Sequence, residues 1–131
     1  MKFHHIFTAL ALFSIVCSCK KETRAEKPYE DLLTSGSWTI SKFVFSIALD
    51  TVNYDGYSLI FTSDGKMQAT NNNSVSAGGA WKIYSSSVHI QMEGDDFNYL
   101  NAYWTFVSQN ASKVEFQTGI VGQYTMTLSR N

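Results

Sequence analysis

Side chains able to move a proton gather at one place in this chain, the acidic segment Glu93-Gly94-Asp95-Asp96, with His89 shortly before it. Paired carboxylates can divide into an acid and a base, and several oxygen ligands in one turn can hold Ca²⁺. The segment lacks the regular alternation of a calcium loop, and carboxylates in a turn that contains glycine are typical of a solvated loop. We therefore expect no catalytic residues, no metal site and no cofactor, and we expect that the protein is not an enzyme.

The other reactive side chains are two cysteines, Cys17 and Cys19, at the end of an N-terminal apolar stretch. Two cysteines one residue apart lack the chain path that a normal disulfide needs. The basic start and the apolar run 6–16 are typical of an export segment, because a helix that spans a bilayer needs about 20 apolar residues. Val16-Cys17-Ser18-Cys19 resembles the lipobox of bacterial lipoproteins. This resemblance implies a signal peptide over residues 1–18 and a diacylglycerol thioether on Cys19.

The resemblance also implies a protein held at the bacterial cell envelope by a lipid anchor. Several acyl chains hold a protein more firmly than one, at about 0.8 kcal/mol for each buried methylene. Residues 19–31 carry many charges and little to bury, so we interpret them as a flexible tether for a domain over residues 32–131. Because no Asp follows Cys19, the start of the tether resembles outer-membrane sorting signals. The choice between the periplasmic and the surface leaflet stays open.

The charge balance excludes one class of partner. Loss of the signal peptide removes Lys2 and leaves nine basic against eleven acidic residues, a net charge of −2. Nucleic-acid binding is typical of strongly basic surfaces, so we expect no nucleic-acid partner. The 113 residues from Cys19 to Asn131 suit one domain that buries a core without disulfides or metals.

The body of the chain has the pattern of an all-β protein. From residue 36 onward it contains no proline, and short runs of β-branched and aromatic residues alternate with turn residues. Short turns such as Ser63-Asp64-Gly65 are of the type that joins antiparallel neighbours. Residues 29–33 have room for a helical turn. The predicted strands are 38–49, 57–62, 66–70, 79–84, 87–92, 100–108, 113–118 and 124–129.

The alternation assigns the faces of these strands. In the run 87–92 the apolar side chains point one way and His89 points the other. In the first run Trp38 and Phe43 have opposite parity, which predicts a β-bulge or bend near Ser41-Lys42. Eight antiparallel strands with one apolar face can close into an up-and-down β-barrel, which removes exposed edges. An open two-sheet sandwich is the alternative.

Two short motifs carry a resemblance to a family. Gly36-Ser37-Trp38, at the start of the first strand, resembles the Gly-x-Trp signature that opens lipocalins, and Arg130 directly follows the last strand. The resemblance implies that Arg130 lies over Trp38 at the closed base of the barrel, a structural contact worth about 0.5–2 kcal/mol. A second motif, Gly79-Ala80-Trp81, resembles the short lipocalin-like domains of bacterial lipoproteins. The similarity to these domains extends over residues 32–130.

Fold resemblance and aromatic content together favour a binding role. An eight-stranded barrel is either filled by side chains or just wide enough for one small ligand. The first hypothesis is a binding module for a small apolar ligand of unknown identity, held near the mouth of the barrel opposite Trp38. Its candidate lining residues are Tyr57, Trp81, Met92 and Trp104.

The second hypothesis is a barrel that acts on an envelope protein through its loops. Two segments are candidate contact surfaces, the polar loop 71–77 and the acidic segment 93–99. The acidic segment contains Phe97 and Tyr99, which we expect to be exposed aromatic anchors of the kind that dominate protein interfaces.

Overall fold

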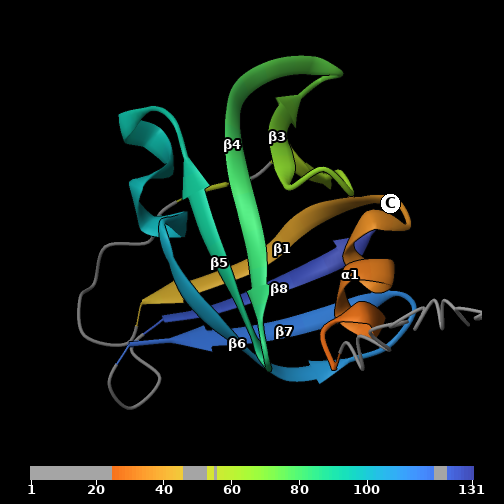
Figure 1. Ribbon diagram of the computed structural model, residues 1–131. Helices are drawn as coiled ribbons and strands as arrows, with labels where there is room; N and C mark the ends of the chain where they lie inside the picture. The colour runs from red at the N-terminus through yellow and green to blue at the C-terminus, as the bar shows by residue number, and fades with distance from the viewer. Residues whose placement is uncertain (1–24, 46–52, 55, 120–123) are drawn as a thin grey trace, which may run out of the picture.

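The protein forms one closed sheet in a computed structural model that describes residues 25–45, 53, 54, 56–119 and 124–131. Eight strands pair antiparallel with their sequence neighbours, and the last pairs with the first, so the barrel closes (Figure 1). The predicted up-and-down barrel is confirmed, and the sandwich alternative is excluded. The strands are β1 (Ser37–Phe45), β2 (Tyr57–Phe61), β3 (Lys66–Asn71), β4 (Ser74–Tyr84), β5 (Ser87–Met92), β6 (Ala102–Gln109), β7 (Lys113–Thr118) and β8 (Tyr124–Arg130).

Apolar side chains from all eight strands fill the interior. The alternation predicted for β5 is present, since Val88, Ile90 and Met92 are buried while Gln91 is exposed. Among the described residues, no charged or amide side chain is buried with this core. Burial of apolar surface stabilises the fold by about 25 cal/mol for each Å². The largest fully buried side chains of the strands are Trp38, Trp104, Phe116, Leu59, Met67, Ile90, Met126 and Leu128.

β1 contains the predicted bulge. Its register with β8 pairs Ile40 with Leu128 and then Lys42 with Thr127, so Ser41 is the extra residue. One extra residue reverses the parity of a strand. Trp38 before the bulge and Phe43 after it therefore both turn toward the core, although the simple alternation would place them on opposite faces.

The prediction of a polar loop over residues 71–77 is wrong, because most of this segment belongs to β3 and β4. β3 and β4 are joined by only two residues, Asn72 and Asn73, with φ of 49° and 64°. Two central residues with positive φ match a type I′ hairpin turn, and asparagine enters this left-handed region more readily than most residues. β4 therefore begins at Ser74, well before the predicted start at residue 79.

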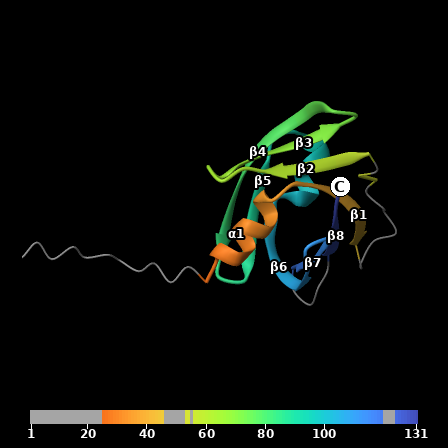
Figure 2. The ribbon, with the colours of Figure 1, turned by 90° about the vertical axis from the view of Figure 1, so that its right-hand side faces the viewer.

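The helix α1 (Lys27–Thr34) lies against one end of the barrel (Figure 2). Pro28 stands in its first turn, where the missing N–H costs no helical hydrogen bond. The Tyr29 ring lies 4.2 Å from the Phe106 ring between centroids, and Leu33 is fully buried. The expected boundary between residues 31 and 32 thus falls inside a helix that packs on the barrel.

The predicted signal peptide 1–18 and the lipidation residue Cys19 lie outside the described residues. Within those that are described, no helix is long and apolar enough to cross a membrane.

The acidic segment forms a short 3-10 helix, η1 (Asp95–Leu100), on the opposite side of the barrel from α1 (Figure 1). A 3-10 helix repeats every three residues, so Phe97 and Leu100 point the same way, and both are buried. The expectation that Phe97 is exposed is therefore wrong, whereas Tyr99 is exposed. Asn101 fixes the end of η1 by hydrogen bonds to the backbone N–H and carbonyl of Met92, at 2.5 and 3.1 Å.

Candidate functional site

The base of the barrel holds the first Gly-x-Trp motif. The Trp38 indole N–H donates to the Leu33 carbonyl at 3.0 Å, and the Arg130 guanidinium carbon lies 4.9 Å from the centroid of the Trp38 ring. Arg130 also donates to the Ser35 hydroxyl. A Cβ added at Gly36 would meet no atom within 4 Å, so nothing in the structure requires glycine there. These contacts join α1, β1 and β8 as a structural clamp.

The four residues predicted to line a cavity lie at different places in the barrel. Trp81 and Trp104 donate their indole N–H groups to the carbonyls of Thr62 and Leu100, at 3.0 and 2.8 Å. Tyr57 packs edge-on against a ring of η1. The hollows on the outer wall and beside α1 are bordered by neither Tyr57 nor Trp104. Trp81 and Met92 border separate hollows on the outer wall.

An aromatic cluster packs at the mouth, beside η1. The Tyr54 ring lies 6.2 Å from the Phe97 ring in a stacked arrangement and 5.2 Å from the Phe43 ring at an edge. The Tyr54 hydroxyl is buried and has no hydrogen-bond partner among the described residues. Burial, together with the nearby Tyr99 and Asp96, raises the pKa of Tyr54 to about 12. The phenol is therefore neutral at physiological pH.

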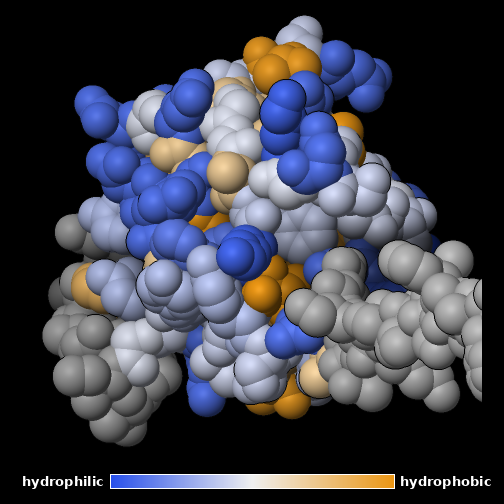
Figure 3. All heavy atoms as spheres, in the orientation of Figure 1, coloured by the Kyte–Doolittle hydropathy of each residue, from blue (hydrophilic) through white to orange (hydrophobic). Residues whose placement is uncertain are grey.

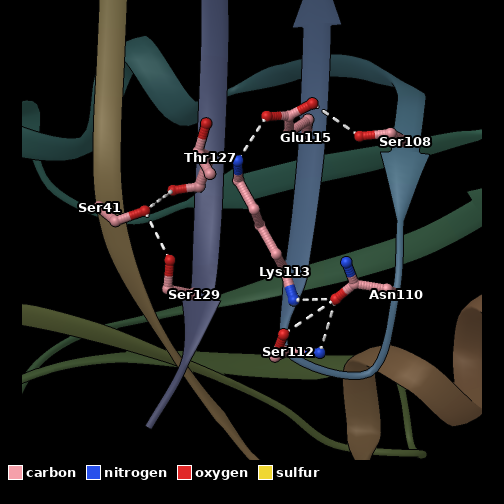
Figure 4. Close-up of polar contacts among 8 residues, drawn as sticks. All are labelled: Ser41, Ser108, Asn110, Ser112, Lys113, Glu115, Thr127 and Ser129. Carbon is pink, nitrogen blue, oxygen red and sulfur yellow. Dashed lines mark hydrogen bonds and ion pairs between the residues drawn. The ribbon is translucent and has the colours of Figure 1, made fainter.

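A groove of about 420 Å³, lined by both polar and apolar side chains, crosses the outer faces of β1, β8 and β7. Figure 4 shows the Glu115 carboxylate, which forms an ion pair with the Lys113 ammonium at 2.8 Å and accepts a hydrogen bond from the Ser108 hydroxyl at 2.6 Å. These two bonds hold the pKa of Glu115 below its ordinary range. Ser129 donates to the Ser41 hydroxyl at 2.8 Å. The polar groups in this close-up thus bond to one another.

Exposed rings gather on the outer wall over β4, β5 and β6. His89 and Tyr103 are cross-strand partners, and their rings stack with centroids 4.1 Å apart and 11° between planes. Tyr84 lies 5.8 Å from the Tyr103 ring, and the Lys82 ammonium lies 5.1 Å from the Tyr84 centroid. Tyr84 and Tyr103 are 44% and 57% exposed. We call Lys82, Tyr84, His89 and Tyr103 the aromatic face.

A shallow hollow of about 250 Å³ adjoins the aromatic face. Three residues of that face, Lys82, Tyr84 and His89, line it together with Trp81 and with Ala80 and Gln91, which are cross-strand partners. Tyr103 lies beside the hollow, on the other side of its stacking partner His89. None of its lining residues is acidic, and Lys82 forms no ion pair with any residue that the structure describes. Figure 3 shows that the wall over β4 and β5 mixes hydrophilic and pale, weakly polar residues with only small apolar spots.

The carboxylates singled out in the sequence do not form a cluster with other ligating groups. Asp95 and Asp96 stand in the first turn of η1 and are exposed. Over the described residues, no group of three His, Cys, Asp or Glu side chains is arranged so that it could hold a metal ion.

The outward position of His89 could be predicted from parity, but its neighbours could not. Lys82 pairs with His89 across the two-residue turn Ser85-Ser86, so this half of the face follows from a recognisable hairpin. Tyr103 joins it only through the register of β5 with β6. That register depends on η1, whose fold the sequence pattern did not reveal.

Comparison with known proteins supports the architecture. No protein-family model and no curated protein matches the chain. Among solved structures, the chain is similar to a DUF4847 family protein from Bacteroides vulgatus ATCC 8482, with a TM-score of 0.58 at 13% sequence identity. The likeness is one of fold. It covers 79% of this chain and 97% of the other, and the identity is too low to transfer an activity.

Proposed function

We propose that this protein is a lipid-anchored, lipocalin-like binding module of the bacterial envelope, without catalytic activity, that meets its partner on the aromatic face. The observation that carries this proposal is the contrast between a filled interior and two tyrosines left exposed on the outer wall. Tyrosine is enriched at binding hot spots because it offers a large rigid surface and a polar tip. An internal apolar ligand would instead need a void among the inward side chains.

The anchor is consistent with the position of the aromatic face. The Glu26 carboxylate accepts a hydrogen bond from the Ser85 N–H at 3.2 Å, so the chain enters the barrel domain beside the β4–β5 hairpin. From Cys19 to Glu26 an extended chain spans at most about 25 Å. A lipid on Cys19 would therefore hold the aromatic face close to the membrane, and the residues after Cys19 favour the outer membrane.

The anchor is tested by cell fractionation. Cys19→Ala should move the protein from the membrane fraction to the soluble fraction of its own host, because acylation needs that thiol. Cys17→Ala is the matched control, since it removes a thiol two residues away and should leave the protein in the membrane. Retention of both variants in the membrane would contradict the lipid anchor.

The contact surface is tested by photo-crosslinking in intact cells. A benzoylphenylalanine placed at Tyr103 should give discrete adducts with an envelope component. The same group at Thr125, an exposed position of β8, is the control and should give none. Equal labelling at both positions, or none at either, would contradict a specific contact through the aromatic face.

A small-molecule carrier is the second candidate function, favoured by the Tyr54 hydroxyl. A buried hydroxyl without a partner is costly, and a polar atom of a ligand at the mouth would satisfy it. Native mass spectrometry of the full chain from its host tests this role. A mass above that of the protein alone, lost in Tyr54→Phe, would show a bound ligand and support a carrier. The mass of the protein alone would favour binding through the aromatic face instead.

A further inference from the structure

We infer that the aromatic face binds a carboxylate-bearing sugar ring of an envelope polysaccharide. This inference rests on the proposed function, because it names the class of partner that the same surface would recognise. Three features of the face lead to it: exposed aromatic rings, a small hollow with hydrogen-bonding walls, and the cation Lys82, which pairs with no carboxylate of the described residues.

The rings provide a stacking surface for a sugar. One side of a pyranose ring presents a set of carbon–hydrogen bonds with partial positive charge, which complement the negative face of an aromatic ring. His89 supports one side of the Tyr103 ring at 4.1 Å, and the Tyr103 side chain is more than half exposed. Because the ring is held by its neighbour, little side-chain freedom is lost when a ligand stacks on it.

The hollow provides room and hydrogen bonds for one ring. Ala80 leaves space between the larger side chains, and its cross-strand partner Gln91 is exposed, with an amide that can both donate to and accept from sugar hydroxyls. The volume of about 250 Å³ lies below the usual range for sites that enclose a drug-sized molecule. The hollow therefore suits a single residue of a longer chain that passes over the wall.

The charge of the face indicates an acidic sugar. The Lys82 ammonium lies over the Tyr84 ring, beside the hollow, and no acidic residue lines that hollow. Lys82 also borders two hollows toward α1, which Glu26, Glu30, Asp31 and Asp64 line, and Glu26 there accepts the Ser85 N–H. The acids therefore lie on the α1 side of Lys82, away from Ala80 and Gln91. A carboxylate on the sugar would complement Lys82 by a charge-assisted hydrogen bond.

The same observations disfavour a folded protein as the partner. A stable protein interface buries roughly 800 Å² on each side around an apolar centre. Figure 3 shows no broad apolar surface over β4 and β5, only small apolar spots among hydrophilic residues. A narrow aromatic surface with polar surroundings fits one or a few sugar residues better.

Isothermal titration of the full chain in detergent micelles tests the inference. The ligands are oligosaccharides of galacturonic, glucuronic, sialic or muramic acid, with maltohexaose as the neutral comparison. We expect at least one acidic oligosaccharide to bind about tenfold or more tightly than maltohexaose. Tyr103→Ala should weaken that binding about tenfold or more, and Lys82→Met should remove the preference for the acidic ligand.

Matched variants separate the site from general effects. Tyr99→Ala removes an exposed tyrosine of η1, and Lys42→Met removes an exposed lysine of β1; neither should change the affinity. Binding of none of the acidic oligosaccharides, or binding that Tyr103→Ala and Lys82→Met leave unchanged, would overturn the inference.

The two proposals fail in different ways. The crosslinked partner could prove to be a protein, with adducts at Tyr103 that protease digests completely, while no acidic oligosaccharide binds in the titration. That result would overturn the sugar inference and leave the aromatic face as a contact surface for a protein. Sedimentation with phosphatidylglycerol vesicles that requires Tyr103 would likewise assign the face to a lipid surface and overturn it. Absence of adducts together with absence of binding would overturn both.

Discussion

At the scale of single residues, β4 and β5 approach each other closely at Gly79. A Cβ built there would lie 2.4 Å from the Gln91 carbonyl oxygen and 2.8 Å from the Met92 sulfur. The adjacent Gly78 has no atom within 4 Å of such a Cβ. The glycine of the second Gly-x-Trp motif is thus sterically required, whereas Gly36 of the first motif is not.

Gly79→Ala should therefore destabilise the barrel, and Gly78→Ala should not. The added methyl at residue 79 must push apart two paired strands, and overpacking of this kind costs about 1–3 kcal/mol of unfolding free energy. At residue 78 the change should stay within about 0.5 kcal/mol. Urea unfolding of the two variants measures the difference. Equal stabilities would show that the strands separate at Gly79 without cost.

Tyr54 should make the protein sensitive to alkaline pH. In the unfolded chain its phenol ionises near 10, while the folded protein raises its pKa to about 12. The unfolded state therefore loses the proton first, and the stability that this residue contributes below pH 10 is lost as pH rises through 12. Urea midpoints measured from pH 9 to 12 should fall less steeply in Tyr54→Phe than in the wild type.

The same substitution should also change stability at neutral pH. Phenylalanine has no hydroxyl to remove from water, so Tyr54→Phe should be more stable than the wild type by about 1 kcal/mol. Tyr99→Phe, at an exposed ring, controls for the loss of a hydroxyl. A less stable Tyr54→Phe would indicate that the hydroxyl has a hydrogen-bond partner, and the case for a ligand at the mouth would then disappear.

At the scale of elements, strands followed from the sequence more directly than helices. Alternation alone located β5 and β7 at their observed bounds, and a change of parity located the bulge at Ser41. Alternation is a strong signal because one face of each strand is buried. In place of α1 we expected only a helical turn over residues 29–33, at the boundary between the tether and the domain. Pro28 followed by Tyr29, Leu32 and Leu33 nevertheless has the spacing of a short amphipathic helix.

η1 was missed because its two buried residues are too few to form a pattern. Phe97 and Leu100 occupy one side of a single 3-10 segment, and the intervening residues are polar. The carboxylates and the glycine suggested a solvated loop instead. Since η1 sets how β6 returns beside β5, the aromatic face could not be assembled from sequence either.

The clamp between the ends of β1 and β8 should contribute measurable stability. Arg130→Met should lower the unfolding free energy by about 0.5–2 kcal/mol, since the guanidinium loses the Trp38 ring and the Ser35 hydroxyl. A double-mutant cycle with Trp38→Phe isolates the pairwise part. The two substitutions should cost less together than their separate effects added. Full additivity would show that the two side chains are adjacent without interacting.

At the scale of the whole molecule, the barrel is closed along its wall and covered at both ends. α1 lies at the base, and η1 with its aromatic neighbours lies at the mouth. A filled barrel with covered ends presents its chemistry on the outside. The DUF4847 neighbour has a similar fold at 13% identity, so the fold tolerates wide sequence change and says little about which outer residues act.

The extent of the folded unit gives the last prediction. A chain beginning at Glu26 should be as stable as the full chain, because α1 and its contacts remain complete. A chain beginning at Leu32 removes Tyr29 from the Phe106 ring and leaves Leu33 without its helix, which should cost about 1–3 kcal/mol of unfolding free energy. Urea unfolding of both chains measures this cost.

Tyr29→Ala in the full chain is the matched control for the truncation. It removes the ring contact with Phe106 but keeps the backbone of α1. If Tyr29→Ala lowers the unfolding free energy less than truncation at Leu32 does, the difference between the two losses is the contribution of the rest of α1. Equal stability of the two truncated chains would instead show that α1 adds nothing to the folded unit, so that residues 19–31 are a tether as first predicted. The Glu26–Ser85 contact would then not fix the position of the β4–β5 hairpin relative to the lipid anchor.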